Sequence, residues 1–180
     1  MHRRPLLALL ARYVPSGGDD REARDRIAAF VEAHADCFER SLLIGHVTAS
    51  AWIVDRERTH ALLTHHRKLG RWLQLGGHTD GDPDVLRSAC REATEESGLR
   101  SLQVLDAGLF DCDVHRIPAR GDEPAHDHHD VRFLLQADMA EPLVVSEESH
   151  DLSWVRLEDV AALETDASVL RMVEKVRRTR

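Results

Sequence analysis

Hydrophobic side chains in the first 40 residues recur at helical spacing. Apolar residues from Leu6 to Val14 return every three to four positions, which predicts an amphipathic helix. The segment Pro15–Asp20 interrupts this pattern and supplies aspartates that can cap a second helix. That second helix would place one apolar stripe along Ile27–His34. We therefore expect two short helices before any β-structure.

From about residue 45 the pattern changes to that of β-strands. The segments predicted to be strands are 46–54, 60–65, 102–115, 131–137 and 152–157. A strongly helical segment runs from Pro83 to Ser97, and an amphipathic helix with valines on one face closes the chain. Strands on both sides of a helix predict an α/β or α+β sandwich. Residues 119–130, rich in Gly, Pro, Asp and His, are predicted to form a long surface loop.

Charge and cysteine content exclude several classes of protein. The 180 residues include 24 Lys and Arg against 32 Asp and Glu, so the net charge of −8 disfavours a nucleic-acid-binding surface. Three separated cysteines without a C-x-x-C pair favour a reducing compartment. The apolar run Leu6–Ala11 is too short for a signal peptide or a membrane span. We expect a cytoplasmic protein.

The acidic end of the helix at 83–97 is the first sign of specific chemistry. Glu92, Glu95 and Glu96 are spaced i, i+3 and i+4, so their carboxylates project from one face. They also lie in the last two turns, where the helix dipole disfavours negative charge. A bare cluster of this kind is often a solvated acidic face. A divalent cation such as Mg²⁺, which prefers carboxylate oxygens, would relieve the repulsion.

The surrounding residues favour the cation site, because Gly77, Arg91 and Gly98 stand at fixed offsets from the glutamates. The segment Gly77–Leu99 resembles the Nudix box, G-x5-E-x7-R-E-U-x-E-E-x-G-U, in which U is a bulky apolar residue. The first box glutamate is replaced by Pro83. In the family this acid mainly braces the box arginine. The neighbouring aspartates Asp80, Asp82 and Asp84 are candidates for that task.

The resemblance implies both a fold and an activity. The fold would be α/β, a Nudix-like α/β/α sandwich with a mixed sheet. One domain would span residues 41–180, and a helical extension of residues 1–40 would pack on it or form a homodimer contact. The activity would be metal-dependent hydrolysis of a diphosphate linkage, with Mg²⁺ or Mn²⁺. The substrate would be a small nucleoside diphosphate linked to another moiety: ADP-ribose or a nucleotide sugar, a nucleoside triphosphate, or a dinucleoside polyphosphate. Neither a nucleic acid polymer nor a membrane is an expected partner.

The resemblance also implies roles for individual residues. Glu92, Glu95 and Glu96 would hold the metal ions, with the carbonyl of Gly76 as a further ligand. Arg91 would orient these glutamates.

A carboxylate must also accept the proton of the attacking water. Glu95 is one candidate within the box. Glu147 and Glu148, from a loop before the strand at 152–157, are the others.

Substrate contacts are expected from residues close to the box. Gly77 and His78 follow the entry strand directly, and His78 is expected near phosphate or metal. Arg67 precedes the box and can meet phosphate oxygens, although a solvated turn is the simpler explanation. Arg132, near the start of a strand, is a weaker candidate of the same kind.

A histidine-rich segment follows at residues 126–129. In an extended chain His126 and His128 share one side, which is the spacing of a metal pair, whereas His129 faces the other way. The sequence shows no third ligand beside them. Polar loop side chains or substrate contacts are therefore favoured over a zinc site.

Two other functions share this fold. Isopentenyl diphosphate isomerases have a similar Gly-His pair, but they carry a catalytic cysteine where this chain has Gly76, and they break the glutamate pair that is intact here. A non-catalytic Nudix-fold nucleotide-binding regulator would be expected to lose box acids. The retained glutamates favour the hydrolase.

Overall fold

The computed structural model describes residues 1–122, 124–147 and 149–179. The helices are α1 (Arg4–Arg12), α2 (Gly18–Ala33), α3 (Val85–Ser97), the 3-10 turn η1 (Val160–Ala162) and α4 (Ala167–Arg178). The strands are β1 (Gly45–Val54), β2 (His60–His66), β3 (Arg71–Leu73), β4 (Leu75–His78), β5 (Gln103–Val104), β6 (Asp111–Ile117), β7 (His126–Gln136) and β8 (Ser149–Arg156). This alternation confirms the predicted α/β class.

The chain divides into two compact units, each assembled from three segments. Unit 1 comprises Met1–Ser50, Gly77–Ala89 and Ala107–Phe133. Unit 2 comprises Ala51–Gly76, Cys90–Asp106 and Leu134–Arg180. The expected domain boundary between residues 40 and 41 stays a prediction. Within the described residues, no helix is both long and apolar enough to span a membrane.

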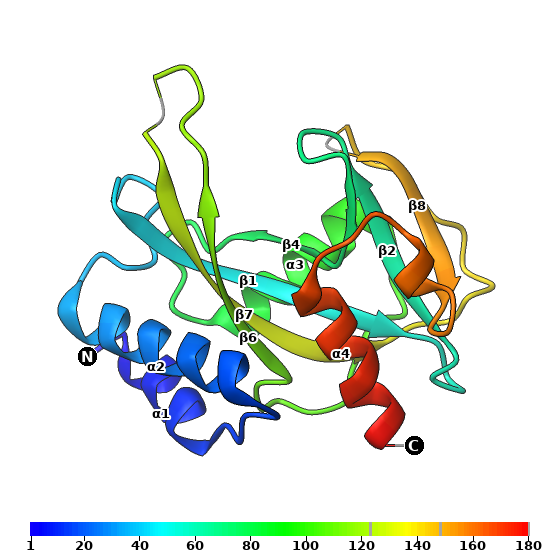
Figure 1. Cartoon of the computed structure of the whole chain (residues 1–180), viewed down its shortest axis with the longest axis horizontal. Coiled ribbons are helices and arrows are strands. Elements are labelled where there is room, and N and C mark those ends of the chain that lie inside the picture. Colours follow the sequence, from blue (N-terminus) through cyan, green and yellow to red (C-terminus); the bar gives the residue numbers. More distant parts are fainter. Residues whose placement is uncertain (123, 148, 180) are drawn as a thin grey trace. The chain divides into compact units, whose positions relative to one another are not determined.

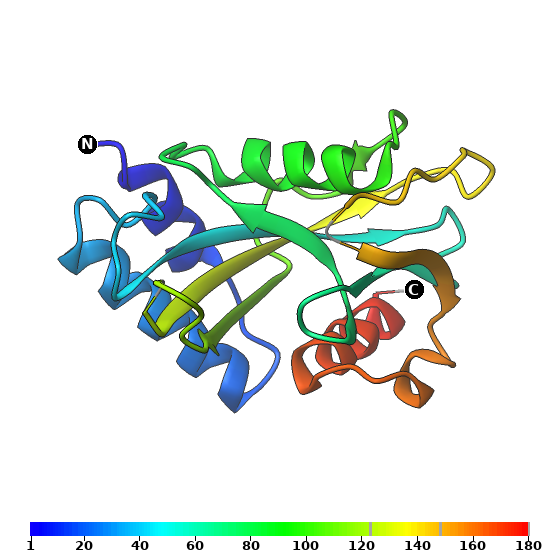
Figure 2. The same ribbon diagram turned by 90° about the horizontal axis from the view of Figure 1, so that it is seen from above.

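Unit 1 contains the two N-terminal helices, which lie side by side (Figure 1). Leu6 and Leu10 of α1 are buried, as are Ile27 and Val31 of α2. Val14 is 84% exposed because α1 ends at Arg12, so the predicted apolar stripe stops one turn earlier. On its other side α2 packs along β6 (Figure 2).

The β6–β7 hairpin completes unit 1 and corrects one prediction. The two strands pair antiparallel from Asp111 opposite Arg132 to Ile117 opposite His126. Residues 126–130 are therefore strand, whereas the whole of 119–130 was predicted to be a loop. Hydrophobic alternation does not reveal this strand, because the side chains that it buries are polar.

Unit 2 is organised around β2. One edge of β2 pairs antiparallel with β8, and its other edge pairs with β1 and then β3. The final helix, α4, lies close to η1 in this unit (Figure 2). Val169, Val173 and Val176 of α4 are buried, which confirms the predicted apolar face.

Helix α3 begins later and ends where the sequence predicts. Its first residue is Val85 and not Pro83, because Asp84 forms the cap, with its carboxylate accepting from the Arg87 N–H at 3.1 Å. At the other end Gly98 has a φ of +72°, and its N–H donates to the carbonyl of Thr94. A glycine in this left-handed conformation is a common helix ending.

We expect Gly98→Ala to destabilise the protein by about 2 kcal/mol or more, since strained φ and steric overlap add together. A Cβ at this position would lie 2.8 Å from Cγ2 of Val144. Gly70→Ala is the matched control, because Gly70 has a φ of +62° but a Cβ there would meet no atom of the described residues within 4 Å. Urea denaturation of both variants measures the difference. If the two variants lost the same free energy of unfolding, overlap with Val144 would contribute nothing to the effect of Gly98→Ala.

Candidate functional site

The three box glutamates lie along the C-terminal part of α3, in unit 2. Their exposure differs strongly: the side chain of Glu95 is 58% exposed and that of Glu92 is 16% exposed, while Glu96 is 8% exposed as a residue. Ala93, on the packed side of the helix, is fully buried. Its small side chain lets this turn pack closely. The carboxylate of Glu95 is therefore exposed to solvent, whereas Glu92 is largely buried and Glu96 is buried.

Arg91 lies against two of these carboxylates. Its Nη1 atom is 2.7 Å from Oε1 of Glu92 and 3.2 Å from Oε2 of Glu95. One guanidinium nitrogen thus bridges neighbouring acids and reduces their mutual repulsion. This contact fits the expected role of Arg91, which is to orient the glutamates.

The third glutamate is joined to the strand that precedes the helix. The backbone N–H of Gly76, in β4, donates to Oε2 of Glu96 at 2.9 Å. A charged acceptor makes this bond stronger than one between neutral groups. It places the Gly76 peptide beside the carboxylates, where the resemblance to the Nudix box expects a carbonyl ligand. Unit 2 therefore brings together the residues expected to hold metal ions.

The aspartates beside Pro83 have contacts in unit 1. Asp80 pairs with Arg40 at 2.7 Å, and Asp82 pairs with Arg87 at 2.6 Å. Both are exposed ion pairs, which contribute little to stability. The replacement of the missing box acid by one of these aspartates stays a prediction.

The remaining candidates of unit 2 flank β2 and β8. Arg67, exposed in the turn after β2, donates from Nη2 to the carbonyl of Ser149 at 3.0 Å. Glu147 is exposed just before β8, so its carboxylate is solvated. Glu148, the other candidate base from this loop, lies outside the described residues.

Arg132, a candidate substrate contact, is deeply buried. It is 1% exposed in unit 1, and its guanidinium contacts Asp130 at 2.7 Å, Asp111 at 3.1 Å and Asp113 at 3.4 Å. Burial alone would lower its pKa, but the three carboxylates raise the pKa of Arg132 above its ordinary value. Arg132 therefore forms the centre of a buried ion cluster, and its contact with substrate stays a prediction.

This ion cluster belongs to a wider polar face in unit 1, formed by alternate residues of β1, β6 and β7. The side chains are His46, Thr48, Ser50, Asp111, Asp113, His115, His126, His128, Asp130 and Arg132. Thr48 and Ser50 donate to Oδ1 of Asp130 at 3.0 and 2.8 Å. The signal in the sequence is polar residues at every second position, but their convergence depends on strand pairing.

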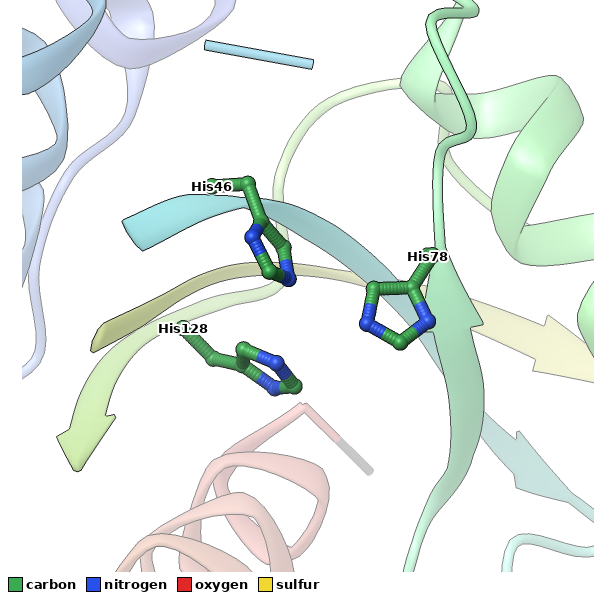
Figure 3. Close-up of side chains that lie close together, drawn as sticks. All are labelled: His46, His78 and His128. Carbon is green, nitrogen blue, oxygen red and sulfur yellow. The ribbon is translucent and has the colours of Figure 1, made fainter. Parts of the chain in front are cut away.

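His78 joins the histidine end of this face. Its ring centroid is 4.9 Å from that of His46 and 5.3 Å from that of His128, and the three rings converge (Figure 3). Burial, together with the charges of Arg40 and His46, lowers the pKa of His78 to about 4. His46 was not among the predicted site residues, because it is a lone histidine in a strand. His129 stacks on Phe30 instead, with ring centroids 3.8 Å apart.

Comparison with known proteins supports the family indicated by the site. A family model described as the NUDIX domain matches residues 45–175. No curated protein sequence matches the chain.

Among solved structures, an Ap4A hydrolase of C. elegans is 19% identical with a TM-score of 0.60, covering 74% of this chain and 96% of that one. A NUDIX-family hydrolase from Clostridium perfringens is 23% identical with a TM-score of 0.53, and the match covers 75% of this chain and 98% of that one. The NUDIX domain of Shewanella oneidensis NrtR, complexed with ADP ribose, is 18% identical with a TM-score of 0.50, covering 74% and 86%.

With three glutamates, the box arginine and the matching fold in place, the chain belongs to the Nudix family. Its fold is the predicted Nudix-like α/β/α sandwich with a mixed sheet and N-terminal helices. By class it is a Nudix-type pyrophosphohydrolase.

Proposed function

We propose that this enzyme uses Mg²⁺ or Mn²⁺ to cleave the diphosphate linkage of a nucleoside diphosphate attached to another moiety. The observation that carries the proposal is the set of three glutamates on α3, with Arg91 against Glu92 and Glu95 and the Gly76 peptide bound to Glu96. These ligands are oxygen atoms, the type that Mg²⁺ and Mn²⁺ prefer. The residues present therefore fit the proposed cofactor.

Each residue has a distinct task in this proposal. Glu92 and Glu96, the more buried acids, hold the cation with the Gly76 carbonyl, and Arg91 keeps Glu92 in position. A bound divalent ion supplies charge neutralisation at the phosphates and lowers the pKa of a coordinated water. Glu95, the most exposed of the three, takes the proton of the attacking water. Glu147 and Glu148 are the alternative bases for that step.

The substrate class follows from the same chemistry. Similar structures include an Ap4A hydrolase and a NUDIX domain complexed with ADP ribose, so dinucleoside polyphosphates and ADP-ribose are the first compounds to test. Gly77 and His78 follow the Gly76 peptide in the chain. Arg67 presents a cation at the surface of unit 2. We propose that Gly77 and Arg67 meet the substrate phosphates, and that the enzyme works in the cytoplasm without nucleic acid polymers or membranes as partners.

The test is hydrolysis of a panel: ADP-ribose, nucleoside triphosphates, nucleotide sugars and dinucleoside polyphosphates. Each is assayed with Mg²⁺, with Mn²⁺ and with chelator. We expect metal-dependent release of a nucleoside monophosphate or phosphate. In Glu95→Gln/Glu96→Gln the rate should fall at least about a hundredfold, because one metal ligand loses its charge and the base that accepts the proton is removed.

Glu158→Gln is the control, since Glu158 is an exposed acid of unit 2 paired with Arg156. It should keep the full rate. Activity that persists in chelator, or in the double variant, would overturn the proposed site. Nucleotide binding without hydrolysis across the panel would instead favour the regulator, and conversion of isopentenyl diphosphate would favour the isomerase.

A further inference from the structure

Five histidines of unit 1 gather at one end of its polar face. They are His46, His78, His115, His126 and His128, called here the histidine cluster. They come from four strands, β1, β4, β6 and β7, so the cluster exists only in the folded chain. It shares no residue with the glutamates of the box.

We propose that His46, His78 and His128 bind one divalent transition-metal ion, represented by Zn²⁺. One ring nitrogen of each residue lies within 4.8 Å of those of the other two. In a tetrahedral zinc site with Zn–N distances of about 2.0–2.1 Å, ligand nitrogens stand about 3.4 Å apart. The rings that converge in Figure 3 would have to bring these nitrogens closer together to enclose an ion.

A fourth imidazole stands at the separation that zinc ligands require. The Nε2 atoms of His126 and His128 are 3.3 Å apart. The Nδ1 atom of His126 is 2.9 Å from the carbonyl of Pro124, which can only accept a hydrogen bond. His126 therefore carries its proton on Nδ1 when neutral and presents the lone pair of Nε2 to the cluster. Bonds of this kind fix the tautomer of metal-binding histidines.

Acidic groups stand next to the histidine cluster. His115, whose ring lies 5.4 Å from that of His128, places Nδ1 3.1 Å from Oδ2 of Asp113. Asp113 belongs to the ion cluster around Arg132, in which three carboxylates face one guanidinium. Carboxylates at this distance favour a cation among the histidines.

The ligand type also separates this ion from that of the box. Imidazole nitrogens suit Zn²⁺ and related transition metals, whereas carboxylate and carbonyl oxygens suit Mg²⁺. The histidine cluster should therefore retain Zn²⁺ in a large excess of Mg²⁺. This inference goes beyond the proposed hydrolysis and does not depend on it.

The experiment measures zinc per chain in tag-free protein dialysed against Zn²⁺ with excess Mg²⁺. The Glu95→Gln/Glu96→Gln background weakens binding by the box. We expect about one zinc ion per chain and a rise in melting temperature. In His78→Gln and His128→Gln the affinity should fall about tenfold or more, whereas His2→Gln, which removes an exposed histidine, should bind like the parent.

Retention of zinc by the histidine variants, or its absence from the parent protein, would overturn the proposal. If a variant fails to fold by circular dichroism, the parent protein still decides the matter. Loaded with Co²⁺, it should show the visible absorption of a tetrahedral site with nitrogen ligands. An octahedral spectrum or no binding of Co²⁺ would count against the site. Hydrolysis plays no part in these measurements, so failure here leaves the proposed activity intact, and the reverse also holds.

Discussion

Arg132→Met is expected to destabilise the enzyme by about 3–5 kcal/mol, which is the typical cost of leaving buried charge uncompensated. The guanidinium contacts Asp111, Asp113 and Asp130 and is almost completely buried. Methionine keeps most of the volume but removes the positive charge. The carboxylates would then repel one another in a region that excludes water. Urea denaturation followed by circular dichroism measures the loss.

The control for this prediction is Arg116→Met on β6, the strand that pairs with β7. Arg116 pairs with Asp127 at 3.0 Å and is 59% exposed, so its removal should cost less than about 1 kcal/mol. If the two variants were equally stable, the buried ion cluster would contribute no more to the free energy of unfolding than the exposed pair of Arg116. Because the substitution acts on stability, a folded Arg132→Met enzyme should keep its KM for substrate.

The second large effect is expected at Arg91. We predict that Arg91→Ala lowers the hydrolytic rate about 10- to 100-fold, as is usual when a group that positions metal ligands is lost. Without the guanidinium, Glu92 and Glu95 lose the nitrogen that lies 2.7 and 3.2 Å from them and repel each other. The metal concentration for half-maximal rate should rise, while KM for substrate changes little. Titration of Mg²⁺ at saturating substrate measures this.

Arg87→Ala provides the matched control, one turn earlier on the same helix. Arg87 is 68% exposed and pairs with Asp82, so we expect the rate to stay within about twofold of the parent enzyme. Arg91→Lys should recover only part of the activity, because a single ammonium cannot reproduce the planar fork of arginine. Equal rates for Arg87→Ala and Arg91→Ala would contradict a positioning role for Arg91.

The box helix was predictable because its information is local. Glycine at position 98, the glutamate spacing and the arginine beside it all act within a few turns of one helix, and the structure places Arg91 against Glu92 as expected. Local rules also located β1, β2 and β8 to within three residues, but they merged β5 and β6 into one predicted strand at 102–115. The helix start was missed because capping by Asp82 and by Asp84 cannot be distinguished from composition alone.

The polar face of unit 1 was not predictable in the same way. His46 and His128 are far apart in the sequence, and only strand pairing brings them together. In the sequence, Arg132 resembles a surface cation. Its partner Asp111 lies on another strand, and its partner Asp130 lies two residues earlier on the same strand. Residues 126–130 contain few apolar side chains, so rules based on hydrophobic alternation assign them to a loop.

Strand β7 carries the two polar groups of unit 1 in a single alternating row, with His126 and His128 followed by Asp130 and Arg132. Inserting one residue after His128 would turn the last two away from Asp111 and Ser50 while leaving the histidines in place. Inserting two would restore the direction of each side chain. During evolution, a change of two residues at this point therefore keeps both groups facing the same side, whereas a change of one gives up the Asp130 and Arg132 group alone.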